Sequence, residues 1–223
     1  MSTRERFERK LNELRADILA MGSLVEEELH MALDALRTMD PAIAAAVNEK
    51  DVVVNQTRFA IEEKCFALIV TQQPAARDLR AIISAINMIV DLERMGDQAK
   101  GIAKVVRHLQ KFPEQERPTG LEAMGQMASG MLRQAMTAYA HDNVELARIV
   151  AAQDDEVDTI YARVFTDIML RMAQVQEPEQ IEASYEILRS ARELERFADL
   201  ATNVAERVIY LVTGSMSEIN QDG

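Results

Sequence analysis

The sequence predicts an all-α protein made of two similar three-helix bundles, with six helices in total. The 223-residue chain has only 8 glycines and 5 prolines, and aromatic residues make up 4%, a composition typical of helical proteins. Apolar residues recur at intervals of three, four or seven, which places them along one face of a helix. The pattern Glu-Arg-x-x-Asp occurs twice, about a hundred residues apart, which indicates that the bundle itself is duplicated.

The first half of the chain contains three predicted helices. A continuous apolar stripe of about nine turns forms the first of them. Asp40 is a suitable N-cap and Pro41 a suitable first residue for the second helix, and Pro74 separates the second helix from the third. The expected bounds are approximately 7–36, 41–68 and 78–109.

The second half repeats this order after a predicted linker, KFPEQERPTG, which holds two prolines and a glycine among charged residues. Asp142 or Asn143 is the expected N-cap of its second helix. Pro178 precedes a third helix that is expected to begin near Gln180. The predicted divisions are 1–110 for the first unit, 111–120 for the linker, 121–214 for the second unit and 215–223 for a flexible tail.

Four features of the two halves align at an offset of 102 to 104 residues. They are Met-Gly at 21 and 124, Asp-x-x-Val at 51 and 154, a helix-breaking proline at 74 and 178, and Glu-Arg-x-x-Asp at 93 and 195. Any one match could arise by chance, but four in the same order indicate a duplication. The two units are therefore expected to be related by pseudo-symmetry.

The duplicated motif predicts a cation site in each unit. Glu93 and Asp97, like Glu195 and Asp199, are like charges one helical turn apart, which repel each other on a bare helix. Both pairs lie outside the stripe of small and apolar residues that we expect to form the core. Carboxylate oxygens suit iron, manganese, magnesium or calcium. Zinc is less well suited, because the sequence has no cluster of Cys or His.

Further oxygen ligands are expected nearby. Asp51 and Asp154 each interrupt an apolar stripe of a second helix, where a carboxylate is unfavourable unless it is paired, capping or ligating. Asp158 forms another pair with Asp154, and Asn203 follows Asp199 by one turn. The complete set of predicted metal ligands is Glu93, Asp97, Glu195, Asp199, Asn203, Asp51, Asp154 and Asp158.

A surface salt-bridge network is the alternative explanation of these carboxylates. Arg94 and Arg196 directly follow the two glutamates, and exposed ion pairs of this kind are common. Glu27-x-x-His30 has the spacing of ligands in di-iron bundles, but a second copy of that motif is missing. The acidic run at 26–28 is expected to be a solvated face, and the single Cys65 is expected to lie in the core.

Charge and composition exclude several classes of function. The net charge is −12 and the pI about 4.8, so we expect no binding to nucleic acid. Neither a signal peptide nor an apolar run of membrane-spanning length is present in the sequence, so a cytoplasmic protein without membrane insertion is expected. The sequence contains no phosphate loop, nucleophile elbow or CxxC motif, and we expect no catalytic activity.

The two most distinctive segments of the sequence are DLERMGDQAKGIA at 91–103 and ELERFADLATNVAE at 193–206. They resemble the paired signatures of the PhoU family, the accessory and regulatory proteins of bacterial phosphate-specific transport, and the opening F-x-x-x-L-x-x-L is also similar to that family. The resemblance covers almost the whole chain and implies two similar three-helix bundles. It also implies acidic motifs that hold iron or other metals in some relatives. Gly101 stands where relatives often have Asn, so the first site is expected to be poorer in ligands.

The resemblance further implies a negative regulator of phosphate uptake and of the phosphate-starvation response. It implies contacts with the ATPase subunit of the phosphate ABC transporter and with the membrane sensor histidine kinase of the phosphate regulon. A homodimer is also expected. Two alternatives remain: a metal-binding helical protein with a storage or redox role, and an adaptor whose carboxylates form salt bridges only.

Overall fold

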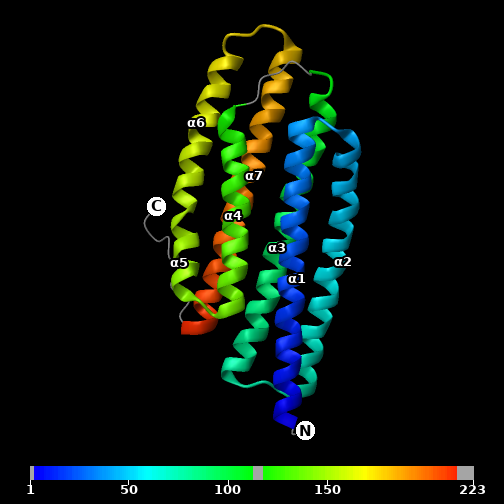
Figure 1. The fold of residues 1–223 in the computed structure, drawn as a ribbon, viewed down its shortest axis with the longest axis vertical. Helices are drawn as coiled ribbons and strands as arrows, with labels where there is room; N and C mark the ends of the chain where they lie inside the picture. The colour runs from blue at the N-terminus through cyan, green and yellow to red at the C-terminus, as the bar shows by residue number, and fades with distance from the viewer. Residues whose placement is uncertain (1–2, 113–117, 215–223) are drawn as a thin grey trace.

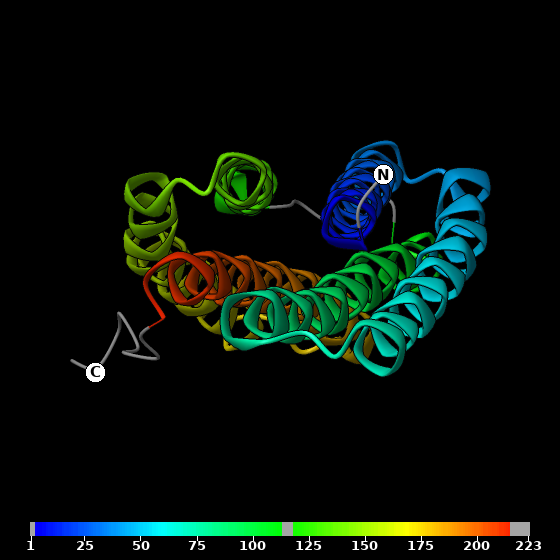
Figure 2. The same cartoon turned by 90° about the horizontal axis from the view of Figure 1, so that it is seen from below.

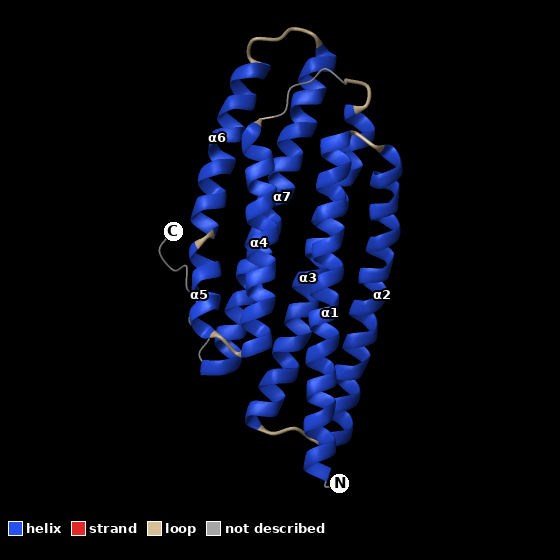
Figure 3. Ribbon diagram, in the orientation of Figure 1, coloured by secondary structure: helices blue, strands red, loops and turns tan. Residues whose placement is uncertain are grey.

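The computed structural model describes residues 3–112 and 118–214, and within these ranges the chain is all-α (Figure 3). The helices are α1 (Thr3–Thr38), α2 (Pro41–Gln72), α3 (Ala76–Leu109), α4 (Thr119–His141), α5 (Val144–Ala152), α6 (Asp154–Met172) and α7 (Pro178–Thr213). Their order and arrangement agree with two successive bundles (Figure 1). The predicted tail at 215–223 and the centre of the predicted linker lie outside the described residues.

The second helix of the second unit differs from the prediction, because Gln153 divides it into α5 and α6. Gln153 keeps right-handed helical angles, with φ −76° and ψ −16°, so the two parts follow each other along one side of the molecule (Figure 1). Three acidic residues, Asp154, Asp155 and Glu156, occupy the first turn of α6. Negative charges are favourable at a helix N-terminus, which explains why a new helix starts here without a proline or glycine.

The other helix boundaries follow from local signals in the sequence. The Asp40 side chain accepts a hydrogen bond of 2.7 Å from the backbone N–H of Ala42, and Pro41 is the first residue of α2. Asn143 is the N-cap of α5 and accepts a bond of 3.0 Å from the N–H of Leu146. Asp142, the other residue considered for this cap, instead ends α4 in the left-handed conformation.

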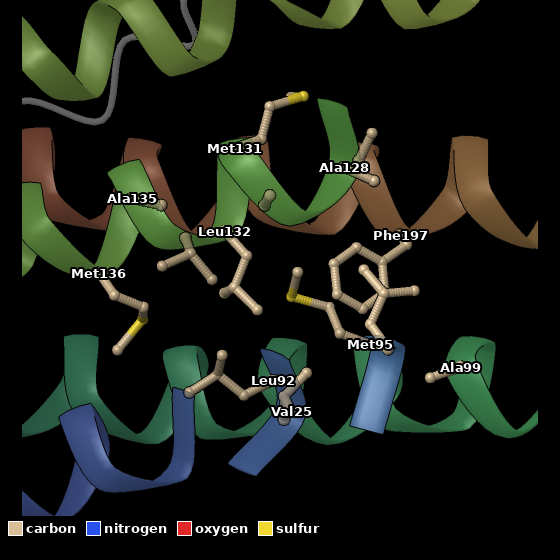
Figure 4. Packing of buried hydrophobic residues seen from close by; sticks show 14 of the residues in the cluster. Val25, Leu92, Met95, Ala99, Ala128, Met131, Leu132, Ala135, Met136 and Phe197 are labelled. Atoms are coloured by element: carbon tan, nitrogen blue, oxygen red, sulfur yellow. The ribbon is translucent and has the colours of Figure 1, made fainter. Parts of the chain in front are cut away.

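The helices α3 and α7 form the centre of the molecule. They pack against each other, α1 and α2 pack on α3, and α4, α5 and α6 pack on α7. Figure 2 shows α1 and α4 on the same side of the central pair. Side chains from these four helices meet between them, including Val25, Met95, Leu132 and Phe197 (Figure 4). The predicted core stripes of α3 and α7 are buried throughout.

Contacts between α1 and α4 repeat themselves about the pseudo-symmetry axis. A Cβ added to Gly22 would lie 2.7 Å from Met136, and a Cβ added to Gly125 would lie 2.7 Å from Leu33. Gly22 and Gly125, like Leu33 and Met136, are 103 positions apart. The pair Gly22–Met136 is therefore equivalent to the pair Gly125–Leu33, and the two units contact each other symmetrically along α1 and α4.

Two polar contacts of the same interface obey the same relation. Arg133 donates to Glu26 at 2.7 Å, and His30 lies 2.8 Å from the Ser129 hydroxyl. Glu26 corresponds to Ser129 and His30 to Arg133 at the same offset. The register of 103 residues therefore holds along α1 and α4.

Candidate metal centre

Three carboxylates of the second unit come together between α6 and α7. Asp158 lies on α6, and Glu195 and Asp199 lie one turn apart on α7. Each side chain offers one oxygen, and these oxygens all lie within 4.8 Å of one another. Glu195 is buried, whereas Asp158 and Asp199 are open to solvent. A cation could therefore reach the group from the surface.

Two oxygens at this site are buried and have no hydrogen-bond partner among the described residues. They are Oε2 of Glu195 and Oδ1 of Asp154, the first residue of α6. The other oxygen of Glu195 accepts a bond of 2.5 Å from Arg192, whose side chain is 54% exposed. Because an unsatisfied buried oxygen is costly, the site fits a ligand that is positively charged and takes oxygen donors.

The carboxylates of this cluster hold their protons more tightly than free carboxyl groups do. Burial and then the nearby Asp199 raise the pKa of Glu195 to about 7. Burial followed by Asp199 and Asp158 raises the pKa of Asp154 to about 6. The pKa of Asp199 is raised as well, by burial and by Asp158, although Arg192 acts in the opposite direction. Burial is the largest cause for each of the three groups, and the like charges of the cluster add to it.

The donor set of the second unit consists of oxygen atoms. Four of the predicted ligands, Asp154, Asp158, Glu195 and Asp199, interact with one another here. Asn203 lies half-buried one turn beyond Asp199 on α7. Oxygen donors suit iron, manganese, magnesium or calcium better than zinc. Metal binding by this set remains a prediction.

The first unit arranges its carboxylates around a lysine. Asp51 is buried on α2, and its Oδ2 accepts bonds from Lys100 Nζ at 2.6 Å and from Asn55 at 3.1 Å. Lys100 also lies 3.9 Å from Asp97, whose side chain is 52% exposed. Burial and then Asp97 raise the pKa of Glu93. Among the described residues these carboxylates do not form a cluster like that of the second unit.

A family model described as the PhoU domain matches the chain twice, over residues 18–106 and 121–208. The chain belongs to the PhoU family. A phosphate-specific transport system accessory protein PhoU homolog from Clostridium acetobutylicum is 33% identical over 219 residues, which cover 98% of this chain and 99% of the relative. A homolog of the same name from Pseudomonas putida is 37% identical over 214 residues, 95% of this chain and 82% of the relative.

Two solved PhoU structures share the fold. The crystal structure of the phosphate transport system regulatory protein PhoU from Streptococcus pneumoniae superposes with a TM-score of 0.89 at 34% identity, covering 96% of this chain and all of that one. PhoU from Pseudomonas aeruginosa gives a TM-score of 0.87 at 37% identity and covers 94% of this chain. The predicted all-α fold of two three-helix bundles is thus confirmed as a PhoU fold.

Glu28, which was not among the predicted site residues, is the most deeply buried carboxylate of the described part of the chain. Glu28 lies on α1 with no exposed surface, and both of its oxygens lack a hydrogen-bond partner in the part of the chain that is described. A Cβ added to Gly96 would lie 3.0 Å from its Oε2. Burial, with Asp51 as the next cause, raises the pKa of Glu28 to about 9.

The expectation that residues 26–28 form a solvated face was therefore wrong for Glu28. A signal was present, because Glu28 lies three residues after Val25 and four before Ala32, on the apolar face of the first helix. Glu27 is exposed and pairs with Lys50. Because Glu28 follows two other glutamates, the three were interpreted together as one exposed acidic run, and its place on the apolar face was overlooked.

Two other residues singled out in the sequence lie away from the carboxylates. His30 contacts Ser129 on α4, whereas Glu27 contacts Lys50 on α2, so they do not converge on a common ligand. Cys65 has no exposed surface, and burial raises the pKa of its thiol to about 11. Its expected place in the core is confirmed. Each described helix lacks an apolar stretch long enough to cross a membrane.

Proposed function

We propose that this protein regulates phosphate transport by restraining phosphate uptake and keeping the phosphate-starvation response off when phosphate is plentiful. The observation that carries the proposal is similarity over nearly the full length of proteins named as phosphate-specific transport accessory proteins. In this proposal the chain acts by contact with the transporter's ATPase subunit and with the sensor histidine kinase. It needs no catalytic group of its own.

A metal centre in the second unit belongs to the same proposal. Asp154, Asp158, Glu195 and Asp199 would hold an ion such as manganese, iron or magnesium, and the ion would satisfy the buried oxygens of α6 and α7. Both helices pack on each other and α7 forms half of the central pair. A bound ion would therefore fix the position of α6 relative to the centre of the molecule.

Deletion of the gene tests the regulatory role directly. In a strain of the source organism grown with ample phosphate, we expect high alkaline phosphatase activity after deletion and normal repression after the gene is restored. The reason is that a starvation response without its restraint stays on. Repressed activity in the deletion strain would contradict the proposal, provided that the same strain still induces the enzyme when phosphate is withdrawn.

The homodimer expected from the sequence also remains a proposal, and α2 is the surface where we place the contact. Val52, Phe59 and Phe66 are 51%, 56% and 55% exposed, and their spacing of seven places them on one face of the helix. Sedimentation equilibrium of the wild type is expected to give a dimer and Phe59→Asp a monomer. A monomeric wild type would contradict the proposal, and Glu63→Asp on the same helix serves as the control.

A further inference from the structure

We propose that the Lys100 ammonium stands permanently in the place of the metal ion in the first unit, so that the protein has one exchangeable metal centre per chain. This inference rests on the metal centre proposed for the second unit. It assigns a role to Lys100 as the residue that decides which of the two related sites accepts an ion.

The two sites contain the same number of carboxylates, although not at the same positions. Asp51, Glu93 and Asp97 correspond to Asp154, Glu195 and Asp199 in the alignment of the halves. The fourth carboxylate of the second unit is Asp158, where the first unit has Asn55. The fourth carboxylate of the first unit is Glu28, where the second unit has Met131. A shortage of acidic groups therefore does not distinguish the first site from the second.

Glu28 reaches this site because α3 leaves room for it. A methyl group at Gly96 would lie 3.0 Å from the Glu28 Oε2 and 3.4 Å from Val54. The equivalent residue of α7 is Ala198, and the residue equivalent to Glu28 in the second unit is Met131. The glycine and the buried glutamate thus occur together, which indicates that the first unit was built to place a fourth carboxylate beside Asp51.

The two sites differ in the cation that the chain supplies. Lys100 Nζ lies 2.6 Å from Asp51 and 3.9 Å from Asp97. The equivalent position in α7 is Thr202, which is 5% exposed and whose hydroxyl lacks a partner among the residues described. An ammonium and a metal ion compete for the same carboxylate oxygens, because both need a negative environment and close oxygen contacts.

Among the residues that the structure describes, the carboxylates of the second unit have no equivalent internal cation. Arg192 contacts Glu195 from the surface with a side chain that is 54% exposed, so it can turn away into solvent when an ion binds. Lys100 is held more firmly, since its side chain is 25% exposed and its acceptor on Asp51 is 3% exposed. A metal ion can therefore displace the arginine of the second site more easily than the lysine of the first.

Metal stoichiometry tests this inference. The purified full-length chain is stripped with a chelator and dialysed against manganese chloride, and bound metal is measured by mass spectrometry. We expect one manganese ion per wild-type chain and two per Lys100→Thr chain, because that variant gives the first unit the residue of the second. Lys104→Thr, an exposed lysine one turn along α3, is the matched control and should keep one ion.

A converse variant keeps the inference testable even if Lys100→Thr does not fold. Thr202→Lys places an ammonium in the second site and is expected to bind no manganese, and Asp199→Asn identifies the ion that belongs to the second unit. Two ions in the wild type, or no gain of an ion in Lys100→Thr, would overturn the role of Lys100. No ion in the wild type would overturn the metal centre of the second unit, and with it the single exchangeable centre per chain. An ion gained by Lys100→Thr in that case would show separately that Lys100 excludes metal from the first unit.

Discussion

The free energy of unfolding is expected to fall as the pH rises from 5 to 9, and Glu28→Gln is expected to remove the largest single contribution to this fall. The folded chain keeps the Glu28 proton to about pH 9, whereas an unfolded chain releases it near 4.5. Between these values the folded state binds more protons, so its stability decreases by about 1.4 kcal/mol per pH unit. The decrease attributable to Glu28 is on the order of 3–5 kcal/mol.

The surroundings of Glu28 set the sign of this effect. Burial is the largest cause of the raised pKa; Asp51 and Asp97 also oppose ionisation, whereas Lys100 and Lys50 favour it. Both oxygens lack a hydrogen-bond partner in the described structure, so no hydrogen bond there stabilises the ionised form. The pKa of this carboxyl is therefore raised rather than lowered, despite the lysine nearby.

Urea unfolding followed by circular dichroism at several pH values measures the effect. Glu28→Gln is nearly isosteric and cannot ionise, so its smaller slope isolates the contribution of Glu28 from those of Glu195, Asp154 and Asp91, whose pKa values are also raised. Glu27→Gln, the exposed neighbour, is the control and should keep the wild-type slope. An unchanged slope in Glu28→Gln would show that this carboxyl ionises normally.

Much of the fold could be predicted because its signals are local. The apolar stripes of α3 and α7 depend on spacing alone, and Asp40 with Pro41 fixes the start of α2 through neighbouring residues. The interruption at Gln153 was missed because the residue keeps helical angles and no breaker stands there. A helix start that depends on a balance of charges in the first turn leaves a weak signal in the sequence.

The candidate site was only partly predictable, for a related reason. The spacing of Glu195 and Asp199 is fixed by their own helix, and the sequence therefore predicts that they lie together. Their approach to Asp158 depends on how α6 packs on α7, and the contact of Lys100 with Asp51 depends on how α2 packs on α3. Distances between residues on different helices depend on how whole helix faces pack, and a short sequence motif does not predict this packing.

Glu195→Gln is expected to stabilise the protein without metal and to destabilise it, relative to the wild type, when manganese is present. In the stripped protein at about pH 8, Glu195 is a buried carboxylate beside Asp199 and Asp158, and its pKa is raised to about 7. A neutral amide removes that repulsion, which we expect to add on the order of 1–3 kcal/mol to the free energy of unfolding. The lost contact with Arg192 costs little, because that side chain is more than half exposed.

Manganese is expected to reverse this order. An ion present at a thousand times its dissociation constant stabilises the folded wild type by about 4.1 kcal/mol, which exceeds the advantage of the variant without metal. Glu195 contributes to this binding because it supplies a buried oxygen that has no hydrogen-bond partner in the described structure. The glutamine variant loses the charge at that position and should gain much less. Urea unfolding with chelator and with manganese measures both effects, and Glu182→Gln, an exposed residue of the same helix, should behave as the wild type does.

The reversal separates the metal centre from the salt-bridge alternative more sharply than either measurement does alone. If Asp158, Glu195 and Asp199 are held only by arginines, manganese should leave the wild type unchanged, and Glu195→Gln should be the more stable protein in both conditions. If they form a metal centre, the same carboxylate that weakens the stripped protein becomes the one it needs when the ion binds. A buried carboxylate beside other carboxylates destabilises the folded state unless a cation is bound next to it.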